Sequence, residues 1–167
     1  MTKTVKKTSD ALKTPKLSNK PSQAIKQAVA DLTAVEKLKK QYIVDMNGWH
    51  DPEDTYSPVT KQETRKCAVC FAGSVIARAG NDPAREIYPE SFPESVANKL
   101  IALDSFRLGD ILGGLETWGI TKIPLILQNR DSWESSATLD ITEYEEDPKQ
   151  FKKDMLEVAS NLEKLGL

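Results

Sequence analysis

The chain has 167 residues, a net charge of −2 at pH 7 and only two cysteines. This length predicts a single domain, which can bury a core without disulfides or a structural metal. The uncharged stretch at residues 67–77 is too short for a membrane span, which takes roughly 20 residues, so we expect no membrane association. Two cysteines three residues apart are no disulfide framework, and no N-terminal run resembles a secretory signal. We therefore expect a cytoplasmic protein.

The charges are unevenly spread along the chain. Residues 1–20 hold six Lys and one Asp, whereas residues 131–167 hold ten acidic and four basic side chains. The first segment has no apolar period, which predicts a disordered basic tail before a single α-helical domain at residues 21–167. The tail is interpreted as a solubilising segment, with nucleic-acid binding through residues 1–20 as the alternative.

The first predicted helix covers about residues 22–46, because apolar residues recur there at steps of three and four. A loop at residues 45–58 follows, indicated by Asn-Gly, Asp-Pro and Ser-Pro pairs. It carries Trp49, the only histidine, His50, and several acidic residues that include Asp51. Acidic side chains close to His50 would favour its protonated form. Trp49 is either a core anchor or a contact for a partner.

A buried central helix is predicted at about residues 61–79. Thr60 and Glu63 fit a capping box, and the Gly-Asn-Asp-Pro sequence at residues 80–83 is a stop signal. From Cys67 to Ala77 the residues are uncharged and mostly small, which is typical of a helix that is covered on nearly every side.

Three further helices are predicted at about residues 93–108, 111–118 and 148–165. The segment 123–142 is either a small two-stranded β piece or an extended stretch held by Trp133 and Tyr144. Five apolar residues of the last helix follow a heptad seam: Phe151, Met155, Val158, Leu162 and Leu165. The seam packs on its own domain or forms a homodimer through the 148–165 helix. The predicted fold class is thus mainly α, a single compact domain of about five helices around the central helix.

Cys67 and Cys70 form a C-x-x-C pair. Tetrahedral zinc takes four ligands, and the chain offers only these two thiols and His50. The pair is interpreted as small core residues, with a metal site or a reactive thiol as alternatives. Phosphate-binding, dinucleotide-binding and zinc-protease motifs are absent from the sequence. We therefore expect no catalytic residues and no cofactor.

Three segments resemble a group of short, mostly phage- or prophage-encoded proteins of no assigned activity. These are Trp49-His50, the C-x-V-C-F-A-G-S-V-I-A motif at residues 67–77, and the K-L-I-A-L-D-x-x-R-x-G motif at residues 99–109. The resemblance implies a viral origin and a common core, and it transfers no catalytic role. We therefore expect a non-enzymatic protein that binds and modulates or inhibits a host protein, such as a defence component. Its candidate contact residues are Trp49, His50, Asp51, Trp133 and Tyr144. The alternatives are a metal- or thiol-dependent enzyme that uses His50, Cys67 and Cys70, and a nucleic-acid-associated or virion component.

Overall fold

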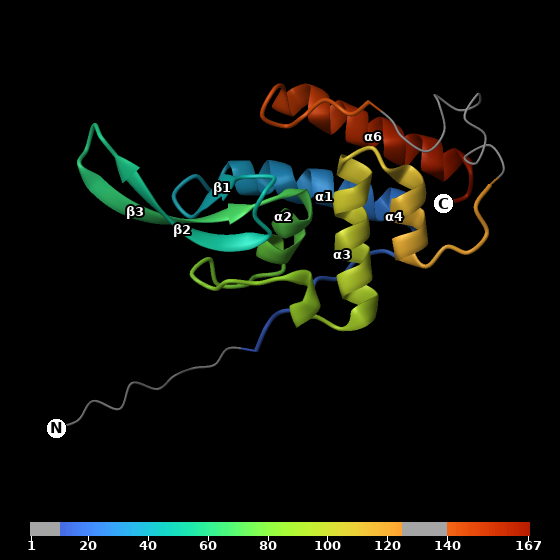
Figure 1. Ribbon diagram of the computed structural model, residues 1–167, viewed down its shortest axis with the longest axis horizontal. Coiled ribbons are helices and arrows are strands. Elements are labelled where there is room, and N and C mark those ends of the chain that lie inside the picture. Colours follow the sequence, from blue (N-terminus) through green and yellow to red (C-terminus); the bar gives the residue numbers. More distant parts are fainter. Residues whose placement is uncertain (1–10, 125–139) are drawn as a thin grey trace.

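Five α-helices and a three-stranded sheet make up the computed structural model, which describes residues 11–124 and 140–167 (Figure 1). The helices are α1 (Pro21–Glu36), α2 (Phe71–Arg78), α3 (Glu94–Arg107), α4 (Ile111–Trp118) and α6 (Pro148–Lys164). The strands are β1 (Tyr42–Val44), β2 (His50–Ser57) and β3 (Gln62–Val69), and a short 3-10 helix, η1, spans Pro89–Ser91. The prediction of about five helices in one domain is confirmed, but the sheet makes the mainly α class only partly right.

The central buried helix exists, but it is shorter than predicted. Helix α2 contacts both α1 and α3, and all of residues 71–77 are buried. Residues 62–69, expected in the same helix, instead form β3. The helix begins after Cys70, whose Sγ accepts a hydrogen bond from the Gly73 N–H at 3.3 Å. The predicted helix at 61–79 was wrong in its first half. Glu63 of the proposed capping box lies in β3, and the apolar residues 67–69 do not by themselves distinguish a helix from a buried strand.

The sheet has the order β1-β3-β2. Strand β1 runs parallel to β3, with Tyr42 opposite Cys67, and β2 runs antiparallel to β3, from His50 opposite Val69 to Ser57 opposite Gln62. The predicted first helix at 22–46 ends ten residues early, and the predicted loop at 45–58 is largely β2. Pro52 is accommodated because β2 is an edge strand, where a missing N–H breaks no ladder.

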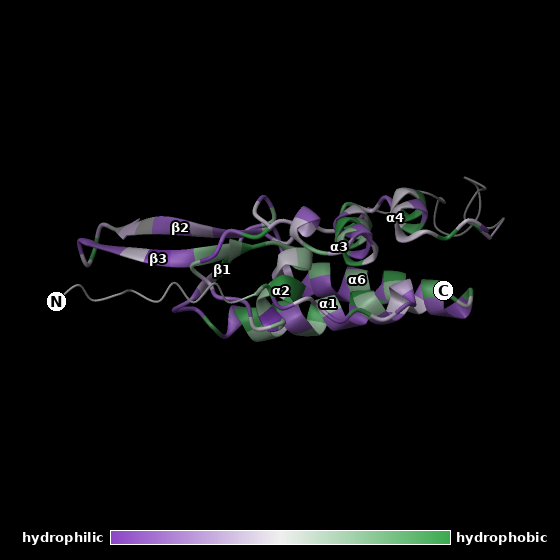
Figure 2. Ribbon diagram, turned by 90° about the horizontal axis from the view of Figure 1, so that it is seen from below, coloured by the Kyte–Doolittle hydropathy of each residue, from purple (hydrophilic) through white to green (hydrophobic). Residues whose placement is uncertain are grey.

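Helices α1 and α6 lie side by side in one layer, below the strands and α3 (Figure 2). Four residues of the predicted heptad seam are buried there: Phe151, Met155, Val158 and Leu162. The seam therefore packs within its own domain, which is the first of the two interpretations given for it above. A homodimer through α6 stays a prediction, and it would use residues other than these four.

Helices α3 and α4 match their predicted ranges closely. The Asp110 carboxylate accepts from the Gly113 N–H at 3.0 Å and caps α4, which Gly119 ends in the left-handed region at φ 97°. A Cβ on Gly114 would lie 3.0 Å from Cζ of Phe106 and closer still to other atoms of that ring. The glycine therefore allows close packing on an aromatic ring. Asp104 pairs with Arg107 at 2.6 Å.

Residues 11–20 run against the helices, although the sequence predicted disorder up to residue 20. The Lys13 N–H donates to Asn81 Oδ1 at 2.8 Å, and Trp118 Nε1–H donates to the carbonyl of Asn19 at 3.0 Å. The domain boundary at residue 21 stays a prediction. Residues 1–10, Trp133 and most of the predicted two-stranded piece lie outside the described residues. Its described ends, 123–124 and 140–142, form no strand.

Candidate interaction surfaces

The hairpin of β2 and β3 extends beyond the body of the molecule (Figure 1). We name residues 53–66 the arm. Its strands pair in continuous register, and residues 58–61 form the connecting turn, in which Lys61 adopts a positive φ of 53°. Strand β1 pairs only with the basal residues 67–69 of β3. Both edges of the arm are therefore open within the part of the chain that the structure describes.

Two apolar side chains are exposed near the tip of the arm. Tyr56 is 63% exposed and Val59 is 91% exposed. Arg65 and Asp54 lie opposite each other in the register, and their side chains approach to 3.8 Å. Both members of this ion pair are mostly exposed, so it contributes little to stability. An isolated two-stranded hairpin is marginally stable in water, so the arm would gain stability from a partner that covers it.

His50 lies at the base of the arm and is fully buried, at 0% exposure. Its Nδ1 lies 2.7 Å from the carbonyl oxygen of Arg85, an acceptor, which places the proton on Nδ1. Its Nε2 has no partner among the described residues. Burial lowers the pKa of His50, and this outweighs the smaller opposing effects of the Arg85 carbonyl, Asp51 and Asp82. Asp51 thus favours the protonated form of His50, in the direction that the sequence predicted for a close carboxylate, but the effect of burial is larger and favours the neutral imidazole.

The neighbours of His50 have different surroundings. Trp49 is half-buried and packs against the main core, so it acts at least in part as the predicted core anchor. Asp51 is half-buried and lines a hollow with Glu53, Arg65 and Tyr88. These residues stay candidates for a partner contact at the base of the arm.

The two cysteines occupy different kinds of position. Cys67 is buried in β3, and Cys70 is buried at the start of α2. Burial raises the pKa of each thiol to about 12. Reactive and metal-binding cysteines need an accessible thiolate, which this environment disfavours. In residues 11–124 and 140–167, no three His, Cys, Asp or Glu residues are grouped so that they could hold a metal ion.

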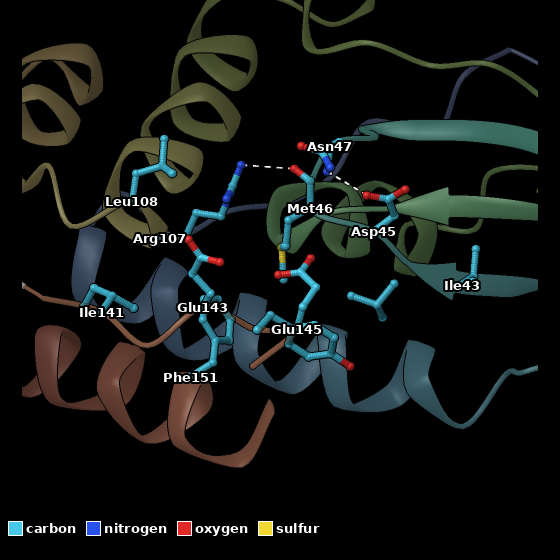
Figure 3. Close-up of a pocket in the computed structure, with 12 residues that line it drawn as sticks. Ile43, Asp45, Met46, Asn47, Arg107, Leu108, Ile141, Glu143, Glu145 and Phe151 are labelled. Atoms are coloured by element: carbon cyan, nitrogen blue, oxygen red, sulfur yellow. Dashed lines mark hydrogen bonds between the residues drawn. The ribbon is translucent and has the colours of Figure 1, made fainter. Parts of the chain in front are cut away.

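A second surface is a cleft of about 730 Å³ between the end of β1, the C-terminal end of α3 and the segment before α6 (Figure 3). Apolar side chains from all of these parts line it: Met46, Leu108, Ile141 and Phe151. Tyr144 lies in the cleft, stacks edge-on against Phe151 at 5.8 Å, and donates its hydroxyl to Glu36 at 2.7 Å. Burial and this bond raise the pKa of Tyr144.

Of the residues selected from the sequence, Trp49, His50 and Asp51 lie at the base of the arm, whereas Tyr144 lies in the cleft. Tyr56 and Val59 were not selected from the sequence, because Tyr56 fell in the predicted loop at 45–58 and Val59 fell between that loop and the predicted helix at 61–79. Their signal is a run of β-branched and aromatic residues around the Ser-Pro turn. None of the described helices is both long and apolar enough to cross a membrane. Comparisons with known protein families, curated proteins and solved structures gave no match.

Proposed function

We propose that this chain is a non-enzymatic interaction protein that uses the arm to bind a host protein and modulate or inhibit it, as a phage-encoded inhibitor of a defence component would. The observation that carries the proposal is the arm itself, with two open strand edges and an apolar tip at Tyr56 and Val59. Open edges accept further strands, and exposed aromatic side chains are common interface anchors.

The size of the arm indicates how a partner would hold it. Residues 53–57 extend for about 17 Å, and two strands are about 10 Å wide, so one face covers about 170 Å². A standard interface buries about 800 Å² per partner. One face of the arm is therefore too small, and we infer that the partner encloses both faces and an edge in a groove.

The two alternatives have less support. The raised pKa of both thiols and the buried His50 do not favour an enzyme built on these residues. Binding of nucleic acid through residues 1–20 remains a separate hypothesis, which predicts an association that weakens steeply with salt.

The proposal is tested by a pull-down from host-cell lysate, with and without nuclease. The wild-type chain is compared with a Tyr56→Ser, Val59→Ser double variant. A matched control is Leu156→Ser, which removes a 42% exposed apolar side chain from α6, away from the arm. We expect one protein at near-stoichiometric yield with wild type and control, unaffected by nuclease and lost with the double variant. Recovery that depends on nucleic acid, or a partner retained by the double variant, would contradict the proposal.

A further inference from the structure

The outer edge of β1 carries unused hydrogen-bonding groups. The Cys67 N–H donates to the Gln41 carbonyl at 2.8 Å, and the Asp45 N–H donates to the Val69 carbonyl at 2.9 Å. Backbone groups alternate in direction along a strand, so the N–H and C=O of Val44, next to Asp45, point away from β3. Within residues 11–124 and 140–167, no hydrogen bond is made to these outward groups of Val44.

Two hollows adjoin this edge. The cleft of about 730 Å³ is one, and a smaller hollow of about 380 Å³ is the other. Ile43, Val44 and Tyr144 line both of them, and Ile43 is 43% exposed. We name the two hollows with their shared edge the β1 groove. It combines an open strand edge with an apolar middle.

The first hollow is acidic. Asp45, Glu143 and Glu145 line it, and none of them has an ion-pair partner among the described residues (Figure 3). Arg107 also lines it, but its Nε bonds to Asp104 at 2.6 Å and its Nη2 to the Met46 carbonyl at 3.0 Å. The guanidinium charge is thus already balanced, and the hollow keeps a net negative charge.

The second hollow is basic. Lys39 and Lys66 line it without an ion-pair partner in the described part of the chain. Its acidic residue, Glu36, is paired with Lys152 and accepts from the Tyr144 hydroxyl. The β1 groove is therefore polarised, with negative charge at one end and positive charge at the other.

We propose that the β1 groove binds an extended segment of a partner protein, which adds to β1 as a further strand. Such a strand bonds to the outward backbone of Val44 and lays an apolar side chain against Ile43. A Lys or Arg of the segment lies over the acidic hollow and an Asp or Glu over Lys39 and Lys66. Three residues of β1 extend for about 10 Å, so the two charges lie about three to four residues apart. Apart from Lys66, the last residue of the arm, the residues that line this groove lie outside the arm.

The test uses a random peptide library displayed against the immobilised full-length protein. We expect enriched peptides with a basic and an acidic residue separated by alternating apolar positions. The affinity of a synthetic peptide with the enriched pattern is then compared with that of a peptide in which neutral residues replace the two charged ones. Failure to enrich this charge pattern would overturn the proposal.

Variants place the bound peptide. Val44→Pro removes the one outward N–H and leaves the ladder to β3 intact, so we expect binding at least about tenfold weaker. Glu143→Lys with Glu145→Lys replaces exposed side chains, and it should weaken binding while the fold is unchanged. Glu146→Lys, an exposed neighbour that does not line the groove, is the matched control.

Other outcomes identify other occupants and overturn the proposal. Peptide binding that neither the proline nor the paired lysine variant weakens would place the site elsewhere. Self-association in sedimentation that Val44→Pro abolishes, without an enriched peptide, would mean that a second copy fills the groove. The Tyr56→Ser, Val59→Ser variant should bind the peptide like wild type, so failure of this proposal is distinguishable from failure of the arm proposal.

Discussion

Replacement of Gly73 by alanine tests the close contact between α2 and the chain before β2. A Cβ at residue 73 would lie 2.8 Å from the carbonyl carbon of Trp49 and closer still to its oxygen. Carbon atoms normally approach to about 3.5 Å, so the backbone would have to move by at least about 0.7 Å. Trp49 precedes His50, whose ring is hydrogen-bonded to the Arg85 carbonyl. A displacement of Trp49 would therefore also strain that buried hydrogen bond.

The expected cost follows from two opposing effects. Overpacking costs about 1–3 kcal/mol of stability. The atoms that the new Cβ meets belong to the backbone and cannot rotate away as a side chain can, so we place the cost of Gly73→Ala near the upper end of this range, at about 3 kcal/mol. Alanine is favoured over glycine in a helix by about 1 kcal/mol, which leaves a net loss of about 2 kcal/mol. For a chain of this size the melting temperature should fall by about 4–8 °C.

Thermal and urea unfolding, followed by circular dichroism, measure this loss. Gly48→Ala is the control, because its Cβ would meet only the Asp51 carboxylate oxygen at 3.2 Å and Ala68 at 3.4 Å. We expect the control to cost less than about 1 kcal/mol. If Gly73→Ala is as stable as wild type or more stable, the helix propensity of alanine outweighs any steric cost at this position. The close packing of α2 on Trp49 would then be refuted.

Three further predictions concern titratable groups. His50 has a lowered pKa in the folded protein, so below about pH 6.5 the unfolded chain binds more protons than the folded one. The free energy of unfolding should therefore decrease as the pH falls from there. Urea unfolding across pH 4–8 should show a weaker pH dependence of this free energy in His50→Gln than in wild type. Burial raises the pKa of Asp31 to about 6, so the ionised carboxylate destabilises the folded protein at neutral pH. After allowance for solvent screening, Asp31→Asn should stabilise the protein by about 1 kcal/mol at pH 7 but not below pH 4. Equal melting curves of variant and wild type at pH 7 would contradict this. Cys67 and Cys70, with pKa values near 12, should not react with a thiol reagent in the native protein at pH 8 and should react fully in urea.

The helices with strong end signals were predictable from the sequence. Asp147 accepts from the N–H groups of Lys149 and Gln150, both at 3.1 Å, and α6 begins where expected. The Asp147 N–H donates to the Glu143 carbonyl at 3.2 Å, and the Gln150 side chain donates to Asp154 at 2.8 Å. Start and stop signals act through neighbouring residues, so they depend little on how the rest of the chain folds.

The sheet was missed because its strands do not resemble isolated strands in sequence. Leu38 and Tyr42 continue the helical spacing of α1, but they lie in the turn and in β1, which pairs with β3 about 25 residues further on. The Asp-Pro pair within β2 and the Ser-Pro pair at its end are typical of a loop, although an edge strand tolerates proline. Pairing between distant segments overrides local patterns, and a single sequence does not display it.

The candidate surfaces were predictable only in part. Trp49, His50 and Asp51 were selected by residue type, and they lie next to the arm, which sequence reasoning did not find. The β1 groove depends on which strand lies at the edge of the sheet and on how residues 143–145 lie beside it. Both are properties of the tertiary structure.

The most direct test of the arm as the binding surface is amide hydrogen exchange of the protein with and without its captured host partner. We expect slower exchange on binding at residues 53–66, since a groove that encloses the arm shields its amides on both edges. Protection confined to the helices or to the β1 groove, with the arm amides exchanging as in the free protein, would contradict the central claim.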